Sequence, residues 1–420
     1  MDYVARIIDP MVTVQLAAAG AVVIRGPKGC GKTETGRHHS HSELDVEDSP
    51  HVRAAMAADP RLLLHGETPR LIDEWQLQPS LWDTVRREVD QRRTKGQFIL
   101  TGSATPREQA TGTGAPHHSG VGRFGLVDMR TMSWRELGWS TGSVPLAGLM
   151  AGGAVEPQHS DLDLETVANR LVIGGWPGNL GLARDAAQTA NANYVELLAT
   201  SDAASAWGIR RDQDKLWRTL QSLARNVSTE CSLATLAADA AGADARLADE
   251  TVSEYLQVFH ALMVEEDVPA WNTHIRSSAR LRKRAKRHLA DPSLCCAALG
   301  LTAPRLLADL EYFGLLFESA AIHDLRVYAS ALRGRVSHYR DSNGVEADAV
   351  VELPDGTWAA FEVKLGFGAT DDAAASLARF AATIDSGRVG PPAALTVITA
   401  SGIAHTRPDG IHVVPLACLG

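Results

Sequence analysis

The sequence lacks the features that mark secreted and membrane proteins. Its five cysteines are odd in number and include no C-x-x-C pair, which argues against a disulfide framework and against a zinc ribbon. The N-terminus has neither the basic region nor the apolar stretch of a signal peptide, and the longest apolar run, residues 16–24, is too short to span a bilayer. We therefore expect a cytoplasmic protein without a membrane partner.

Length and composition are those of ordinary globular domains. The chain has 420 residues, of which 45% are hydrophobic and 22% are charged. At roughly 100–200 residues per domain, this length predicts two to four domains. The net charge of −9 argues only weakly against a nucleic-acid partner, because an average over several domains can hide a basic face.

The first 140 residues alternate short apolar runs with polar amphipathic stretches. This alternation is typical of an α/β fold with a parallel sheet. The apolar runs lie at residues 21–25, 62–64, 70–73 and 98–101.

A phosphate-binding pattern follows the first apolar run and opens a polar helix. The sequence GPKGCGKT matches G-x-x-x-x-G-K-[ST] in the required context of strand, loop and helix. In such a loop backbone N–H groups face phosphate oxygens, Lys32 reaches the β- and γ-phosphates, and Thr33 ligates Mg²⁺. The sequence therefore predicts a site for ATP and Mg²⁺. Its nucleotide-binding residues are Gly26, Pro27, Lys28, Gly29, Cys30, Gly31, Lys32 and Thr33.

Two later apolar runs end in polar side chains that suit ATP hydrolysis. In a P-loop ATPase, Asp73 would hold Mg²⁺ through water and Glu74 would polarise the attacking water. The run at residues 98–100 is followed by Thr101 and Ser103, and either hydroxyl could orient water or contact the γ-phosphate. The sequence does not show which of the two hydroxyls has this role.

Cysteine and histidine near the phosphate loop raise the questions of a reactive thiol and of a metal site. Cys30 lies at a helix N-terminus, where thiols can be reactive, but filling a small-residue slot is the simpler interpretation. A solvent-facing helix end explains His38, His39 and His41, and no carboxylate spacing supports a metal site there. We predict no zinc at these histidines.

These motifs resemble AAA+ ATPases, and specifically a bacterial and archaeal family that joins such an ATPase to a C-terminal domain of unknown function. The resemblance runs over nearly the whole chain and includes residues 71–76, residues 99–104, Gly122-Arg123 and Gly175-Trp176-Pro177. It implies that Arg123 acts as an arginine finger on the nucleotide of a neighbouring subunit, which would require a homo-oligomer. A solvated loop arginine is the alternative.

The middle of the chain combines a helix-turn-helix pattern with a basic run. Residues 232–240 and 249–264 read as two helices around a turn. Seven basic residues follow within twelve positions: Arg276, Arg280, Arg282, Lys283, Arg284, Lys286 and Arg287. Neutralising DNA phosphates with such residues releases counterions, so this run predicts binding to the DNA backbone. A solvated face is the alternative.

The C-terminal segment contains a β-hairpin with a Pro-Asp-Gly loop at residues 354–356. If Leu353 lies opposite Thr357, Asp348 falls opposite Glu362, and Glu346 falls opposite Lys364. Period-2 alternation then puts these four charged side chains on one face.

An Asp followed by Glu-x-Lys on a hairpin resembles the PD-(D/E)xK nuclease site. In that site two acids, here Asp348 and Glu362, bind Mg²⁺, and the lysine, here Lys364, stabilises or positions the hydrolytic water. The family resemblance adds Glu318 as the helical acid of that fold. A ladder of cross-strand ion pairs is the alternative.

The fold we expect is α/β, with a P-loop AAA+ parallel-sheet domain at residues 1–150, a helical connector at 151–220, a winged-helix-like domain at 221–295 and a restriction-nuclease-like α/β domain at 296–420. The expected function is Mg²⁺-dependent ATP hydrolysis coupled to a DNA-binding, nuclease-like end, in a defence or toxin-like role. The alternatives are a nucleotide-switched DNA- or protein-binding regulator with an inactive nuclease-like domain, and a STAND-like regulator that senses a small ligand.

Overall fold

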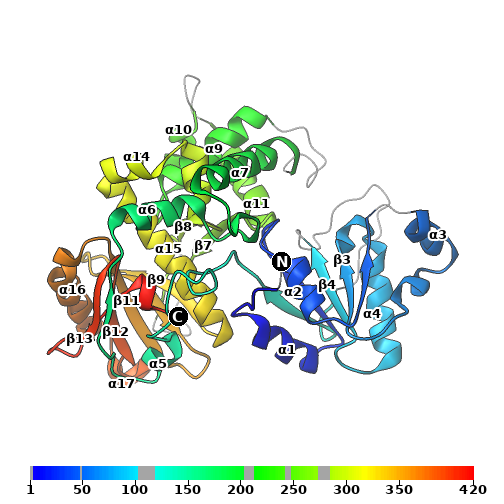
Figure 1. The fold of residues 1–420 in the computed structure, drawn as a ribbon, viewed down its shortest axis with the longest axis horizontal. Coiled ribbons are helices and arrows are strands. Elements are labelled where there is room, and N and C mark those ends of the chain that lie inside the picture. The colour runs from blue at the N-terminus through cyan, green and yellow to red at the C-terminus, as the bar shows by residue number, and fades with distance from the viewer. Residues whose placement is uncertain (1–2, 48–49, 103–118, 203–211, 242–246, 273–283) are drawn as a thin grey trace. The chain divides into compact units, whose positions relative to one another are not determined.

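The structure is a computed structural model, and Figure 1 shows its ribbon. It describes residues 3–47, 50–102, 119–202, 212–241, 247–272 and 284–420. The chain forms two compact units, residues 1–131 with 261–263, and residues 132–260 with 264–420. Both units contain a β-sheet with helices, which confirms the predicted α/β fold class. The finer division into four domains stays a prediction.

The sheet of the first unit has five parallel strands in the order β2-β3-β4-β1-β5. The strands are β1 (Ala21–Arg25), β2 (Ser42–Asp45), β3 (Arg70–Asp73), β4 (Phe98–Gly102) and β5 (Phe124–Asp128). Three of the four apolar runs of the sequence form strands of this sheet. The fourth, at residues 62–64, lies in the 3₁₀ helix η1 (Pro60–Leu64), where the Asp59 side chain caps the helix by accepting a hydrogen bond from the Arg61 N–H.

Helices cover both faces of this sheet because its strands are apolar on both sides. Val22 and Ile24 pack with Val12 of α1, whereas Val23 on the opposite face packs with Val85 of α4. The helices of this unit are α1 (Asp9–Ala18), α2 (Lys32–His38), α3 (Pro50–Ala58), η2 (Trp75–Leu77) and α4 (Ser80–Arg92).

The second unit contains a mixed seven-stranded sheet in the order β6-β13-β14-β12-β11-β10-β9. Its strands are β6 (Gln158–Ser160), β9 (Arg335–Arg340), β10 (Glu346–Glu352), β11 (Trp358–Lys364), β12 (Ala394–Thr399), β13 (Gly402–Thr406) and β14 (His412–Pro415). A core of Trp271, Trp358 and Phe380 packs against it, and the long helix α15 (Leu310–Ala331) contacts β9, β10 and β11.

The β10–β11 hairpin has the register that its loop predicts. Leu353 N–H donates to the Thr357 carbonyl at 2.8 Å, Ala349 pairs with Phe361, and Glu352 pairs with Trp358. This confirms the predicted register from the loop to Ala349, while the predicted pairs Asp348–Glu362 and Glu346–Lys364 lie beyond this ladder and stay a prediction. The pairing of β10 with β9 shifts between Ala347 and Val350, so that Asp348 lies at an irregularity of the strand.

The remaining helices of the second unit precede and surround this sheet. They are α5 (Leu146–Met150), α6 (Leu164–Ile173), η3 (Pro177–Asn179), α7 (Arg184–Leu197), η4 (Leu198–Asp202), α9 (Gln213–Arg225), α10 (Leu233–Asp239), α11 (Asp249–Ala261), α13 (Pro292–Leu299), α14 (Ala303–Ala308), η5 (Phe367–Ala369), α16 (Thr370–Thr383), α17 (Ser386–Val389) and η6 (Leu416–Cys418). Gly174 ends α6 at φ +74°, and a Cβ there would lie 2.3 Å from Ser293 Oγ.

Two helices and a small antiparallel sheet follow one another where the helix-turn-helix was expected. Helices α10 and α11 are followed by β7 (Glu265–Val268), which pairs with β8 (Lys286–Leu289). The designation of this region as a winged helix stays a prediction. In the described part of the chain, no helix has the length and apolar character needed to cross a membrane.

Candidate functional site

The phosphate loop connects β1 to α2 at the carboxyl edge of the first sheet. Gly29 and Gly31 have φ values of +80° and +102°, which other residues rarely adopt. A Cβ on Gly26 would lie 2.3 Å from the Met129 carbonyl oxygen. The glycines of the motif are therefore required by backbone conformation and by close packing.

The side chain of Lys32 folds back onto the phosphate loop. Its Nζ donates hydrogen bonds to the carbonyl oxygens of Gly26 at 3.0 Å and Pro27 at 2.9 Å, and the residue is 6% exposed. Lys28 of the same loop is exposed. The loop thus holds a buried ammonium group beside the backbone N–H groups that would bind phosphate.

Asp73 joins the loop to the neighbouring strand ends. Thr33 Oγ1 donates to Asp73 Oδ1 at 3.0 Å, and Thr101 Oγ1 donates to the same oxygen. These residues come from α2 and from the ends of β3 and β4, which the parallel sheet brings to one edge. Their oxygens are the hard donors that Mg²⁺ prefers, so the residues present fit this ion. Ser103, the other predicted hydroxyl, lies outside the described residues.

Glu74 directly follows this carboxylate in a strained backbone conformation. Its φ of +53° and ψ of +38° are left-handed, and its carboxylate accepts a hydrogen bond from Gln76 Nε2. Such a conformation costs about 1–3 kcal/mol and is often found at functional sites. Strand β3 ends at Asp73, and the left-handed Glu74 begins the turn into η2.

Cys30 is fully buried, and its Sγ lies 3.8 Å from the Met129 carbonyl oxygen. This environment agrees with the small-residue interpretation of the thiol. Arg123 pairs with Asp90 of α4, with Nε 2.8 Å from Oδ1, while its side chain remains 39% exposed. Its role as an arginine finger stays a prediction.

The predicted acids of the C-terminal hairpin come together with Lys364. Lys364 Nζ lies 2.9 Å from Glu362 Oε1 and 3.9 Å from Asp348 Oδ2. The Val363 N–H donates to Asp348 Oδ2 at 2.9 Å. Asp348 and Glu362 are buried, with exposed fractions of 6% and 4%.

A second lysine, Lys286, also contacts these acids, although the sequence pattern predicted it as part of the basic run. Lys286 Nζ lies 2.7 Å from Glu318 Oε1 and 3.1 Å from Asp348 Oδ1. We predicted Lys286 as part of a DNA-contacting run, but its ammonium is buried between two carboxylates. The inward orientation of Lys286 could have been predicted from strand alternation, because Lys286 and His288 lie on the same face of β8. His288 is buried, and its Nδ1 lies 3.1 Å from Ser319 Oγ.

Arg287 also has partners inside its own unit. Its Nη1 lies 2.7 Å from Asp267 Oδ1 and 3.1 Å from Glu265 Oε1. Burial raises the pKa of Asp267 to about 7. Arg284 is exposed and stays a predicted phosphate contact. The other members of the run lie outside the described residues: Arg276, Arg280, Arg282 and Lys283.

We name the five charged residues Lys286, Glu318, Asp348, Glu362 and Lys364 the carboxylate–lysine cluster. Burial and the charge of Asp348 raise the pKa of Glu318 to about 8 and the pKa of Glu362 to about 7. Burial also opposes ionisation of Asp348, but the two lysines outweigh it and keep the pKa of Asp348 below its usual value. Three carboxylates facing two ammonium groups leave one negative charge to be neutralised by a proton or a cation.

The cluster fits a divalent cation only in part. Glu362 Oε2 is buried and has no hydrogen-bond partner among the described residues, so one carboxylate oxygen is available as a ligand. However, Glu318, Asp348 and Glu362 do not each bring an oxygen within 4.8 Å of the others. Lys286 instead occupies the space between Glu318 and Asp348.

The raised pKa values predict that stability depends on pH. The folded state holds protons on Glu318 and Glu362 that the unfolded chain releases near pH 4.5, so the free energy of unfolding should fall as pH rises from about 5 to about 8. Because one pKa unit corresponds to about 1.4 kcal/mol, the expected loss is about 3–8 kcal/mol, depending on whether the cluster holds one proton or two. Urea denaturation followed by tryptophan fluorescence measures it.

Glu318→Gln and Glu362→Gln should each flatten this pH dependence. Glu311→Gln is the control, because Glu311 lies on the same helix as Glu318 and is exposed. A slope unchanged in both cluster variants would contradict the assignment.

Family models match three parts of the chain. Residues 18–138 match an AAA domain, residues 164–305 match a domain of unknown function (DUF8612), and residues 313–419 match a second domain of unknown function (DUF4143). The AAA match confirms the predicted nucleotide-binding ATPase class at this coarse level, and the predicted union with a C-terminal domain of unknown function is also confirmed. The nuclease-like character of that domain is not.

The curated relatives carry no functional description. The chain is 26% identical over 352 residues to the uncharacterized proteins Rv2008c of Mycobacterium tuberculosis and Mb2031c of Mycobacterium bovis, covering 83% of this chain and 71% of each relative. Among solved structures, the Walker-type ATPase PABY2304 of Pyrococcus abyssi aligns with a TM-score of 0.40 and 12% identity, over 69% of this chain and 94% of that chain.

Proposed function

We propose that this protein is a Mg²⁺-dependent ATPase whose nucleotide state controls a DNA-binding, nuclease-like second unit. The observation that carries the ATPase part is the convergence of Thr33, Asp73 and Thr101 beside the phosphate loop. Three elements far apart in sequence deliver these oxygens to one edge of the sheet. An AAA match over the same region supports the same activity.

Each residue of this edge has a chemical role in the proposal. Thr33 and Asp73 would hold Mg²⁺, which would supply charge neutralisation at the phosphates of ATP. Lys32 leaves the carbonyl oxygens of Gly26 and Pro27 and turns to the phosphates. Glu74 leaves Gln76 and orients the attacking water, and Thr101 keeps Asp73 in place.

The nuclease-like part of the proposal depends on the carboxylate–lysine cluster. Asp348 and the unpartnered oxygen of Glu362 would bind a divalent cation, and Lys364, within 2.9 Å of Glu362, would position the hydrolytic water. DNA would be held by the basic run, of which Arg284 is an exposed described member.

A second candidate is a nucleotide-switched regulator that binds DNA or protein without cleaving it. Lys286 favours this candidate, because its ammonium lies within 3.1 Å of both Glu318 and Asp348 and provides the positive charge that a metal would otherwise supply. In this case the cluster stabilises the fold and ATP changes the grip on the partner.

A cleavage assay separates the two candidates. Wild-type protein is incubated with linear and circular DNA, with Mg²⁺ or Mn²⁺, with and without ATP. If the nuclease-like site is active, Lys364→Ala should lower cleavage by about 10²-fold or more, as expected for loss of a group that stabilises charge in the transition state. Lys215→Ala, which alters a surface lysine of α9, is the control. Absence of cleavage in every condition, together with an ATP-dependent electrophoretic shift, favours the regulator.

A further inference from the structure

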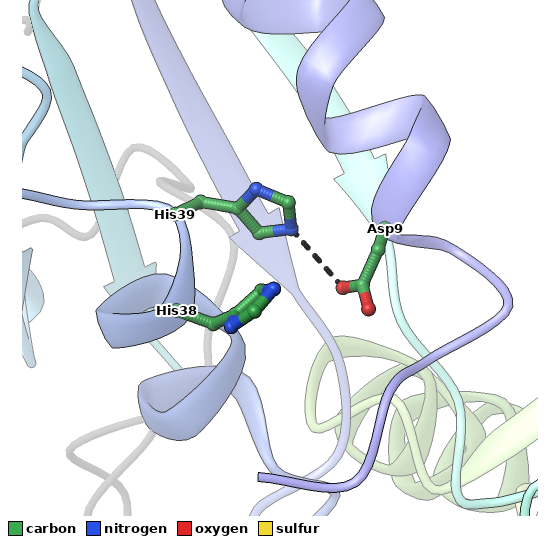
Figure 2. A group of neighbouring side chains, drawn as sticks. All are labelled: Asp9, His38 and His39. Carbon is green, nitrogen blue, oxygen red and sulfur yellow. Dashed lines mark hydrogen bonds and ion pairs between the residues drawn. The ribbon is translucent and has the colours of Figure 1, made fainter.

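A carboxylate and two imidazoles meet at the far end of the P-loop helix. Asp9 begins α1, His38 is the last residue of α2, and His39 follows it. Figure 2 shows the three side chains turned toward one another. One ligand atom from each lies within 4.8 Å of the others, and the described part of the chain contains no other such group of three His, Cys, Asp or Glu residues.

The carboxylate of Asp9 is held in position from two sides. The Tyr3 hydroxyl donates to Asp9 Oδ1 at 2.7 Å, and the Arg6 N–H donates to Asp9 Oδ2 at 2.7 Å. His39 Nε2 lies 3.1 Å from Asp9 Oδ1. Hydrogen bonds of this kind orient the ligands of metal sites.

The imidazole of His38 is held differently. Its ring stacks on Tyr3, with centroids 4.2 Å apart and planes at 15°, whereas its nitrogens make no hydrogen bond to a described residue. The hydrogen bonds of Asp9 and its ion pair with His39 explain these two residues, but they do not explain why an aromatic ring fixes His38 beside them. A metal ligand requires such a fixed imidazole with an available nitrogen.

We propose that Asp9, His38 and His39 bind a divalent transition metal ion of the Zn²⁺ type, with water in the remaining position. Two imidazoles and one carboxylate suit Zn²⁺ and disfavour Mg²⁺, which prefers oxygen ligands. Metal–ligand distances of about 2.0–2.2 Å set the ligand atoms of a tetrahedral site roughly 3.4 Å apart. The 3.1 Å separation of Asp9 and His39 is already close to this spacing.

The site is connected to the phosphate loop through Arg6. Arg6 is 7% exposed, and its Nη1 donates to the Cys30 carbonyl at 2.9 Å while Nη2 donates to the Arg130 carbonyl at 2.8 Å. Its backbone N–H binds Asp9, and α2 runs from Lys32 to His38. A metal held by Asp9, His38 and His39 would therefore fasten α1 to the C-terminal end of α2, while Arg6 contacts the phosphate loop that precedes this helix.

Metal titration tests the proposal without any ATP turnover, so its outcome is independent of the proposed ATPase function. Zn²⁺ is titrated into metal-free full-length protein by calorimetry, and Co²⁺ is titrated as a spectroscopic probe of a tetrahedral site. Wild-type protein should bind one equivalent in a saturable step. It should also show the visible absorption of tetrahedral Co²⁺.

His38→Gln is the most informative variant, because it removes a ligand and breaks no hydrogen bond to a described residue. It should weaken metal binding by about 10-fold or more, and Asp9→Asn should do the same. His41→Gln is the matched control, since His41 lies beyond the same helix end and its Nδ1 contacts the Thr68 carbonyl oxygen instead. Absence of saturable binding to wild type, or equal affinity in wild type, His38→Gln and Asp9→Asn, would overturn the proposal.

Discussion

Lys32→Ala is expected to abolish ATP hydrolysis, with a loss of at least about 10²-fold in kcat, because no other ammonium group is buried in the described phosphate loop. The γ-phosphate would then develop charge in the transition state without its lysine. Release of phosphate from purified protein measures the effect.

The matched control is Lys95→Ala, because Lys95 is exposed in the same unit. Circular dichroism must show that Lys32→Ala is folded, since the substitution leaves the carbonyl oxygens of Gly26 and Pro27 without their present donor. A folded variant with wild-type turnover would remove the P-loop assignment.

Glu74→Gln is expected to separate nucleotide binding from hydrolysis. Glutamine has nearly the shape of glutamate and can keep the contact with Gln76, but it has no negative charge with which to orient and polarise water. Loss of a group that orients and deprotonates water costs about 10²–10⁴-fold in rate. Binding of a fluorescent ATP analogue should remain near the wild-type level while phosphate release falls.

Glu67→Gln serves as the control, because Glu67 is exposed and lies shortly before the same strand. If Glu74→Gln hydrolyses ATP normally while Lys32→Ala does not, another residue orients the water. Thr101 would then be the first residue to test, because it contacts Asp73. Loss of both binding and hydrolysis would instead indicate that Glu74 maintains the loop itself.

Much of the fold follows from local pattern. Apolar runs bounded by turns predicted strands β1, β3 and β4, and the Pro-Asp-Gly loop predicted the pairing of Ala349 with Phe361. Both depend on residues that are close in sequence. The eight-residue loop motif likewise predicted where β1 would end and α2 would begin.

Local pattern did not predict the environment of Lys286, because long-range packing determines it. Its neighbours in sequence are basic, so the local pattern indicated a solvated or DNA-facing surface. Its partners Glu318 and Asp348 are 32 and 62 residues away. A buried ammonium group is stable only when carboxylates accompany it, and no local pattern shows where those carboxylates will lie.

The histidines after the phosphate loop show the same limit. No local pattern predicts a carboxylate beside His38 and His39, because Asp9 precedes His39 by 30 residues. Packing of α1 and α2 on the same side of the sheet brings them together. The position of Asp9 beside the two histidines is thus a result of tertiary packing.

The sequence by itself determined the α/β class, the phosphate loop and the hairpin register, since these depend on periodicity and on turn residues within a few positions. Only the tertiary structure decided which polar and charged groups share a buried or partly buried site. Asp73 with Thr101, Lys286 with Glu318, and Asp9 with His39 meet because separate elements pack against one another. Burial then makes each pairing necessary, because a charge removed from water must find a partner in the fold.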